Sequence, residues 1–133
     1  MAGVYLCRYD KVNGKYVEIS SGNFSNPVIF DFTISGSGEV LEKVEEYYIL
    51  IRDTVVNKIY LRMSGYHSHI KIEFSLDKEN WSEDLLINRY INAVNSEVVI
   101  PIYIKVSITD EFGVFPLNQI TNFNDLKIIL TYT

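Results

Sequence analysis

The chain has 133 residues, a net charge of −5 at pH 7 and one cysteine, Cys7. This length suits a single domain, residues 1–133, that folds without a structural metal, and one cysteine leaves no internal disulfide. The acidic balance argues against a nucleic-acid partner, and because no apolar run reaches ~20 residues and no secretion signal opens the chain, we expect neither a membrane partner nor a signal peptide.

The first 20 residues predict an N-terminal hairpin that lies beside the main body or projects from it as an arm. Residues 4–9 and 16–19 are rich in apolar and aromatic side chains. Between them, Asn13 and Gly14 form the strongest hairpin-turn dipeptide, because both residues tolerate positive φ. Residues 20–27 form a loop by composition.

The segments up to residue 52 predict two further strands with an irregular region between them. Apolar side chains at positions 28, 30, 32 and 34 indicate a core strand. Residues 39–46 have part of a helical spacing, so a helical turn is an alternative to extended chain there. Residues 47–52 predict the next strand, in which we place Ile49 on a face that should be wet.

The centre of the chain contains two strands with clear period-two alternation, residues 58–63 and 69–76. Ile59 and Leu61 share one face of the first strand, and Ile72 and Phe74 share one face of the second. The four residues 65–68 are short enough to join the two strands as a hairpin. A four-residue turn then leads to Trp81, the only tryptophan.

The second half of the chain is less regular. For residues 82–97 we favour a short strand near residues 85–87 and an extended loop, and a helix capped by Ser82 is the alternative. Residues 98–109 form the longest predicted strand. Pro101 places one end of it at an edge or a bulge, because proline cannot donate a ladder hydrogen bond. Residues 110–125 form a second long loop, and residues 126–132 form the closing strand.

About eight strands separated by turns, with no long helix, predict an all-β fold: an antiparallel β-sandwich of two sheets, with a jelly roll as the alternative. No internal repeat is present, which excludes a propeller or a solenoid. The residues expected to be buried are Ile72, Phe74, Ile104 and Ile128.

Two groups of side chains have the types of ligand that metals use. His67 and His69 would point the same way on a strand, but spacing places no third ligand beside them. Four carboxylates crowd one turn: Asp77, Glu79, Glu83 and Asp84. The twelve-residue calcium loop with its central glycine is missing, so we expect no metal in either group.

No catalytic signature occurs along the chain. The Gly-x-Ser-x-Gly elbow of serine hydrolases is absent. Gly36 and Gly38 lack the lysine and the helix of a phosphate-binding loop. Cys7 has no activating neighbour in the sequence and lies in a predicted strand. We therefore expect a protein that is not an enzyme and has no cofactor.

Two short segments resemble known proteins. Residues 74–81 read F-S-L-D-K-E-N-W, which resembles the strand-turn segment F-S-x-D-x-x-x-W of immunoglobulin-like sandwiches, many of them in bacteriophage virion proteins. Residues 100–106 are similar to the penultimate strand of small phage head and tail sandwiches. The resemblance implies that the sandwich is immunoglobulin-like and serves as a structural or adhesive module, and it carries over no catalytic residue. The first segment also resembles the Asp-box of sialidase propellers, but that box recurs several times in a chain and here it occurs once.

Aromatic side chains are numerous, with ten Tyr and seven Phe, and several fall on faces that should be wet. Because a monomer seldom exposes large apolar patches, we expect a partner to cover them, although long loops that cap the sandwich are the alternative. The interface candidates are Tyr5, Tyr9, Tyr16, Tyr90, Phe112, Phe115 and Phe123.

The expected function is that of a non-enzymatic virion structural protein, such as a phage capsid decoration or a tail-associated component, made in the host cytoplasm. Its expected partners are further copies of itself, as a homo-oligomer, and other virion proteins. The alternative is a carbohydrate-binding module in which Trp81 and surface tyrosines stack on a surface glycan.

Overall fold

In a computed structural model of the protein, the described residues form eleven strands and no helix. The described residues are 2–21, 24–25, 30–36, 38, 40–64, 68–110, 113, 117–123 and 127–133. The strands are β1 (Gly3–Asp10), β2 (Lys15–Ser21), β3 (Phe24–Ser25), β4 (Phe30–Thr33), β5 (Val40–Arg52), β6 (Val55–Ser64), β7 (Ile70–Ser75), β8 (Leu85–Asn92), β9 (Glu97–Thr109), β10 (Ile120–Phe123) and β11 (Lys127–Tyr132).

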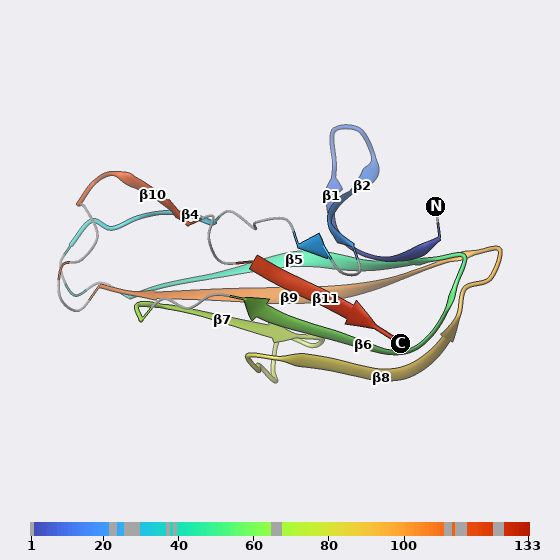
Figure 1. Cartoon of the computed structure of the whole chain (residues 1–133). Coiled ribbons are helices and arrows are strands. Elements are labelled where there is room, and N and C mark those ends of the chain that lie inside the picture. Colours follow the sequence, from blue (N-terminus) through green and yellow to red (C-terminus); the bar gives the residue numbers. More distant parts are fainter. Residues whose placement is uncertain are drawn as a thin grey trace.

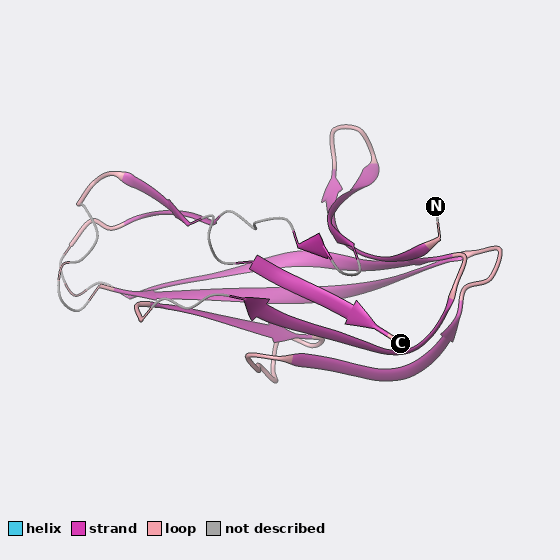
Figure 2. Cartoon of the chain, viewed as in Figure 1, coloured by secondary structure: helices cyan, strands magenta, loops and turns pink. Residues whose placement is uncertain are grey.

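The strands form two packed antiparallel sheets and one small ribbon (Figures 1 and 2). The large sheet has the order β3-β2-β1-β5-β9-β7, and the small sheet has the order β11-β6-β8. The ribbon pairs β10 with β4 at one end of the molecule. Without the two-residue β3, the two packed sheets contain five and three strands. The predicted class, an antiparallel β-sandwich of about eight strands, is confirmed.

The longest ladder in the fold joins β5 to β9. Thirteen residue pairs run from Val40 opposite Thr109 to Arg52 opposite Glu97. This ladder includes residues 40–46, so the helical turn considered for that segment is wrong. Pairing along the whole of β9 satisfies the backbone of these residues, and this outweighs a weak local helical spacing.

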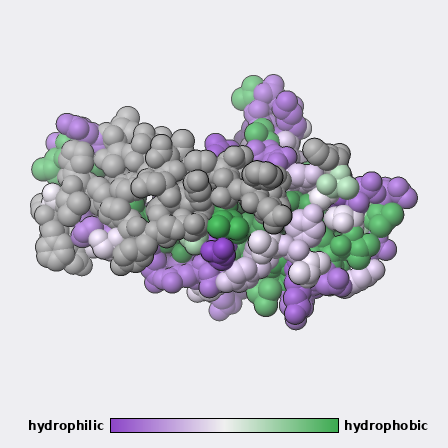
Figure 3. Space-filling model, in the orientation of Figure 1, coloured by the Kyte–Doolittle hydropathy of each residue, from purple (hydrophilic) through white to green (hydrophobic). Residues whose placement is uncertain are grey.

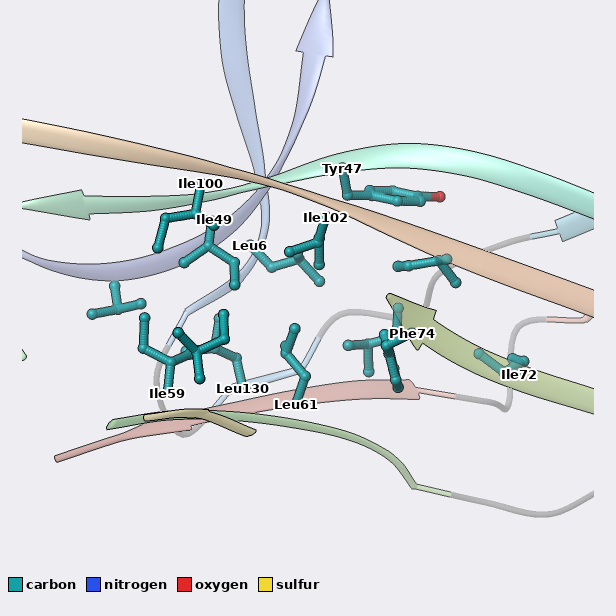
Figure 4. Close-up of a cluster of buried hydrophobic side chains, with 14 of the residues drawn as sticks. Leu6, Tyr47, Ile49, Ile59, Leu61, Ile72, Phe74, Ile100, Ile102 and Leu130 are labelled. Atoms are coloured by element: carbon teal, nitrogen blue, oxygen red, sulfur yellow. The ribbon is translucent and has the colours of Figure 1, made fainter. Parts of the chain in front are cut away.

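The main core lies between the two sheets (Figure 4). The large sheet contributes side chains such as Leu6, Tyr47 and Ile102, and the small sheet contributes Ile59, Leu61 and Leu130 from the opposite side. Alternation directs every second residue of each strand into this layer. All four residues expected to be buried, Ile72, Phe74, Ile104 and Ile128, belong to the core.

Ile49 was placed on a wet face, and this is wrong because its side chain is fully buried in the main core. Residues 47–51 are apolar or aromatic at every position, so their sequence has no period-two alternation to show which face is inward. The other face of this stretch is covered as well. Leu50 packs there with Tyr5 and Cys7 in a second, smaller apolar cluster on the outer side of the large sheet.

The predicted hairpin between the two central strands is also wrong. β6 pairs with β11 and β8 in the small sheet, whereas β7 pairs with β9 in the large sheet. The chain therefore passes from one layer to the other between them. Both strands alternate cleanly because each has one face on the shared core, and alternation does not identify the partner strand.

The region from residue 82 to residue 97 is more regular than the sequence predicted. β8 extends over eight residues, Leu85–Asn92, and therefore exceeds the short strand expected near residues 85–87. A tight connection follows, in which Asn95 has a φ of 57° and its backbone N–H donates to Asp53 Oδ1 at 2.9 Å. The alternative helix is absent from this segment, and Ile87 and Ile91 face the core from β8.

Candidate functional site: an aromatic arm and the adjoining sheet face

The N-terminal hairpin leaves the large sheet partway along β1. Residues from Gly3 to Cys7 pair with β5, from Arg52 back to Tyr48, but the pairing of β1 with β2 continues to Asp10. A register shift between Leu6 and Cys7 marks the bend, as expected of a β-bulge. Residues 8–18, called the arm from here on, stand out from the body of the molecule (Figures 1 and 3).

The tip of the arm is an ordered turn. Asp10 Oδ1 accepts hydrogen bonds from the backbone N–H groups of Val12 at 3.0 Å and Asn13 at 3.3 Å, and Asp10 Oδ2 accepts one from Asn13 Nδ2 at 2.7 Å. The bonds from Asn13 lower the pKa of Asp10 from its ordinary value. Gly14 has a φ of 64°, which glycine adopts without strain. The turn presents Val12 to solvent with 93% of its surface exposed.

Three tyrosines join the arm to the outer side of the large sheet; we call them the tyrosine cluster. The ring centroid of Tyr16 lies 5.1 Å from that of Tyr9 and 5.3 Å from that of Tyr48, and the Tyr9 and Tyr48 centroids are 6.3 Å apart. The rings are tilted or edge-to-face, which is a favourable arrangement for aromatic pairs. Tyr9 and Tyr16 remain 40% and 39% exposed, so the cluster holds the arm and also presents aromatic surface.

Glu46 binds the hydroxyl of Tyr48 at the base of the cluster. The Tyr48 hydroxyl donates to Glu46 Oε1 at 2.8 Å. This hydrogen bond, with a smaller contribution from burial, raises the pKa of Tyr48 to about 12. Tyr48 therefore stays neutral across the physiological pH range, and its ring position is fixed by a charge-assisted bond.

Two further aromatic side chains, Tyr103 and Trp81, lie on the same outer side, further across the large sheet, and each contacts a lysine. The Lys78 ammonium lies 4.6 Å from the ring centroid of Tyr103, and the Lys105 ammonium lies 4.3 Å from that of Trp81. Both distances suit cation–π attraction. The Lys105 side chain is only 17% exposed, so Trp81 and its neighbours cover it.

Cys7 is buried beneath this outer side. Its side chain packs with Tyr5 and Leu50, and burial raises the pKa of the Cys7 thiol to about 11. A thiol with so high a pKa carries little thiolate near neutral pH and is a poor nucleophile. The Tyr5 hydroxyl donates to the Ala2 carbonyl oxygen at 2.9 Å and so closes this small cluster.

The acidic turn after β7 uses its first carboxylate internally. Asp77 Oδ1 accepts hydrogen bonds from the Ser75 hydroxyl and from the backbone N–H groups of Glu79 and Asn80, and Asp77 Oδ2 accepts one from Asn80 Nδ2, all within 2.9 Å. These bonds, led by the backbone N–H of Asn80, hold the pKa of Asp77 well below its ordinary value. Across the described part of the chain, no three His, Cys, Asp or Glu side chains gather as metal ligands.

The structure places the predicted interface residues in different environments. Tyr9 and Tyr16 come together on the arm, while Tyr90 is 65% exposed on β8 in the small sheet. Tyr5 is 8% exposed and so adds little surface. Phe112 and Phe115 lie outside the described residues, as does the side chain of Phe123.

Of the two histidines considered as metal ligands, the structure describes His69. His67 lies outside the described residues. His69 Nδ1 lies 3.1 Å from the Thr109 carbonyl oxygen.

The sequence prediction missed the role of Tyr48, because its partners Tyr9 and Tyr16 are far from it along the chain. The contact between Trp81 and Lys105 was also missed, because these two residues are far apart in the sequence.

Comparison of the chain with models of known protein families, with curated proteins and with solved structures found no match. Among the described residues, no helix has the length and apolar character needed to cross a membrane.

Proposed function

We propose that this protein is a non-enzymatic structural component that works by assembly of many copies, and that the arm makes the contacts. The setting that we propose is a phage virion, in which the protein acts as a capsid decoration or a tail-associated component alongside other virion proteins. The virion setting rests on the resemblance of residues 74–81 and 100–106 to phage sandwich proteins. The assembly mode rests on the arm itself.

The observation that carries the proposal is an ordered projection with exposed apolar side chains. Four of the exposed large hydrophobic residues lie on the arm: Tyr9, Val12, Tyr16 and Val17. The tyrosine cluster and the Asp10 turn hold the arm in one conformation, so a partner that binds it loses little conformational entropy. A projecting β-hairpin also has strand edges that can pair with another chain.

Two edge strands of the main body, β7 and β8, are less suited to pairing with another chain. Ser82 bridges the edge strand β7 at Phe74, with N–H to carbonyl distances of 2.7 and 3.1 Å. In β8, Arg89 and Tyr90 lie opposite the single residue Asn57, which is a bulge. Bulges and charged residues on edge strands discourage pairing, so these two edges favour the arm as the contact.

A carbohydrate-binding module is the second candidate. Trp81 and Tyr103 lie on one side of the large sheet, as aromatic rings that stack on sugars would. Against it, the ring of Tyr103 already has the Lys78 ammonium over one face, and the three rings of the tyrosine cluster are inclined to one another and form no flat platform for a sugar. Assembly therefore remains the first candidate.

The test is the molar mass of the purified chain in solution, measured by light scattering. We expect the wild-type protein to be larger than a monomer, and the double variant Val12→Glu/Val17→Glu to have a lower mass, since both residues are exposed on the arm. Deletion of the residues before Ser20 is unsuitable, because Val4 and Leu6 belong to the main core.

The matched control is Val94→Glu, an exposed valine in the turn between β8 and β9, away from the arm. It should keep the mass of the wild-type protein. A wild-type protein that stays monomeric at all concentrations would contradict the assembly proposal, and a glycan array would then decide whether sugar binding takes first place.

A further inference from the structure

We infer that a second copy of this chain docks on the outer face of the large sheet, in a twofold arrangement that also brings each arm against the other copy. This inference rests on the proposed function and names its partner and its surface. The outer face consists of the side chains of β5, β9 and β7 that point away from the core, together with Lys78 and Trp81. Alternation places Tyr48 and Tyr103 on it, because Tyr47, Ile102 and Ile104 face the core.

The charges of the outer face are already matched within one chain. Arg52 Nη2 lies 2.6 Å from Glu97 Oε1, and these residues face each other on β5 and β9. Lys105 Nζ lies 3.8 Å from Glu42 Oε1.

The other charged residues of the outer face also have partners within the chain. Lys71 Nζ lies 3.8 Å from Glu73 Oε2 on β7. The remaining acid, Glu46, accepts a hydrogen bond from the Tyr48 hydroxyl, and the ammonium of the remaining base, Lys78, lies over the ring of Tyr103. Because each charge has a partner, covering this face leaves few buried charges uncompensated.

The outer face is therefore neutral on a protein that is acidic elsewhere. It carries four basic and four acidic side chains, whereas the other eight basic and thirteen acidic side chains give the chain its net charge of −5. Two copies of an acidic protein repel each other over most of their surfaces. The face on which charges cancel is where two copies approach at the lowest electrostatic cost.

The composition of the same face suits a protein partner. Tyr48, Tyr103 and Trp81 supply aromatic surface, and exposed Pro101 lies directly opposite Tyr48 between β5 and β9. Tyr and Trp are enriched at protein interfaces and often carry much of the binding energy there.

The position of the arm favours a second copy over an unrelated ligand. The tyrosine cluster fixes the arm at the border of the outer face, since Tyr48 belongs to both. A chain that covers the face therefore also meets the arm. Twofold pairing is the commonest arrangement of identical chains, and it places the same two features of both copies in contact.

The test introduces an unpaired charge at the centre of the face without removing a packed side chain. Pro101 is exposed and donates no ladder hydrogen bond, so Pro101→Glu and Pro101→Lys are both compatible with the strand. We expect each variant to sediment as a single chain under conditions in which the wild-type protein sediments as a dimer or larger. Val94→Glu, at an exposed position in the turn between β8 and β9, should keep the wild-type mass.

Trp81, the only tryptophan, provides a second readout at the face itself. Its emission should shift to longer wavelength when the wild-type protein is diluted, because dissociation exposes the indole to water. In Pro101→Glu the emission should not change with concentration. Circular dichroism and the melting temperature establish that both proline variants are folded, and if Pro101→Glu is not, Pro101→Lys decides the result.

The outcomes separate this inference from the proposed function. If Val12→Glu/Val17→Glu lowers the mass and folded Pro101 variants do not, the arm proposal stands and the docking face is overturned. If the wild-type protein is monomeric, both are overturned. A monomer that binds a glycan array, with binding lost in Pro101→Glu, would assign the face to a sugar and would also overturn the inference.

Discussion

Among the side chains that the structure describes, Phe74 is the largest wholly apolar one that is fully buried. It lies on β7 and packs into the main core between the two sheets (Figure 4). Its backbone N–H and carbonyl also bind Ser82, so the residue connects the core to the turn that carries Trp81. Substitution at this position therefore reports on core packing.

Phe74→Ala should lower the free energy of unfolding by about 3–5 kcal/mol, through lost burial and the cavity left behind. Urea denaturation measures this change. Leu76→Ala is the control, because Leu76 is exposed two residues further on, and it should cost less than about 0.5 kcal/mol. A loss below about 1 kcal/mol for Phe74→Ala would contradict the position of the ring in the core.

Asp77 organises the turn that follows β7. Its carboxylate accepts backbone and side-chain hydrogen bonds. The hydroxyl of buried Ser75 in turn accepts hydrogen bonds from the backbone N–H groups of Asp77 and Lys78. These contacts favour the ionised carboxylate, so the pKa of Asp77 is lower in the folded chain than in the unfolded chain. The contribution to stability is present above the unfolded pKa of about 3.9 and is lost as the pH falls toward the folded pKa.

Asp77→Asn should therefore be less stable than the wild-type protein at pH 7, and the difference should shrink as the pH falls below about 4. Urea denaturation at several pH values measures it. Glu79→Gln, an exposed carboxyl on the same turn, serves as the control for a simple change of net charge. A difference that stays constant between pH 7 and pH 3 would show that Asp77 acts without its charge.

β1 serves two parts of the molecule. Its first half pairs with β5 and contributes Val4 and Leu6 to the core, and its second half pairs only with β2 in the arm. The bend between these halves lets one strand support both the sandwich and the projection. The tyrosine cluster then limits how far the arm moves, because two of its rings lie on the arm and the third lies on β5.

Tyr16→Ala should loosen the arm and leave the sandwich intact. It removes two edge-to-face or tilted ring contacts, each worth about 0.5–1.5 kcal/mol. Limited trypsin digestion should then cleave faster after Lys11 and Lys15, while the midpoint of urea unfolding changes little. Tyr90→Ala, an exposed tyrosine on β8, should leave the cleavage rate unchanged. Equal cleavage of Tyr16→Ala and the wild-type protein would mean that the cluster does not hold the arm.

Over the whole molecule, one main core joins the two sheets and a smaller cluster lies outside the large sheet. The long β5 and β9 strands run through most of the length of the sandwich (Figure 1). β11 contacts β3 and β2, so the two sheets approach each other at that edge. The fold is stabilised by apolar burial between layers rather than by covalent links, since its single cysteine forms no internal disulfide.

The melting temperature should therefore be the same with and without a metal chelator. Apolar packing of the core needs no ion, and the Asp77 carboxylate is occupied by hydrogen bonds within its own turn. Differential scanning calorimetry with and without EDTA measures this. A fall of several degrees in chelator would place a structural metal in the protein and would direct attention to the His67 and His69 pair or to the acidic turn.

The class of fold and the inward faces of several strands could be predicted from the sequence alone. Ile72, Phe74 and Ile104 were placed in the core because period-two alternation is a local property, visible within six or seven residues. The hairpin at Asn13 and Gly14 was equally local. Where the alternation was absent, as around Ile49, the sequence did not identify the inward face.

The pairing of strands, in contrast, could be read only from the folded chain. β6 and β7 follow each other in the chain but lie in different sheets, and residues 40–46 are extended because β9 pairs with them. The tyrosine cluster and the neutral outer face arise in the same way, from residues on β1, β2, β5, β7 and β9. Strand pairing joins segments far apart in the sequence, and its register depends on how both sheets pack on the shared core, so no short stretch of sequence contains that information.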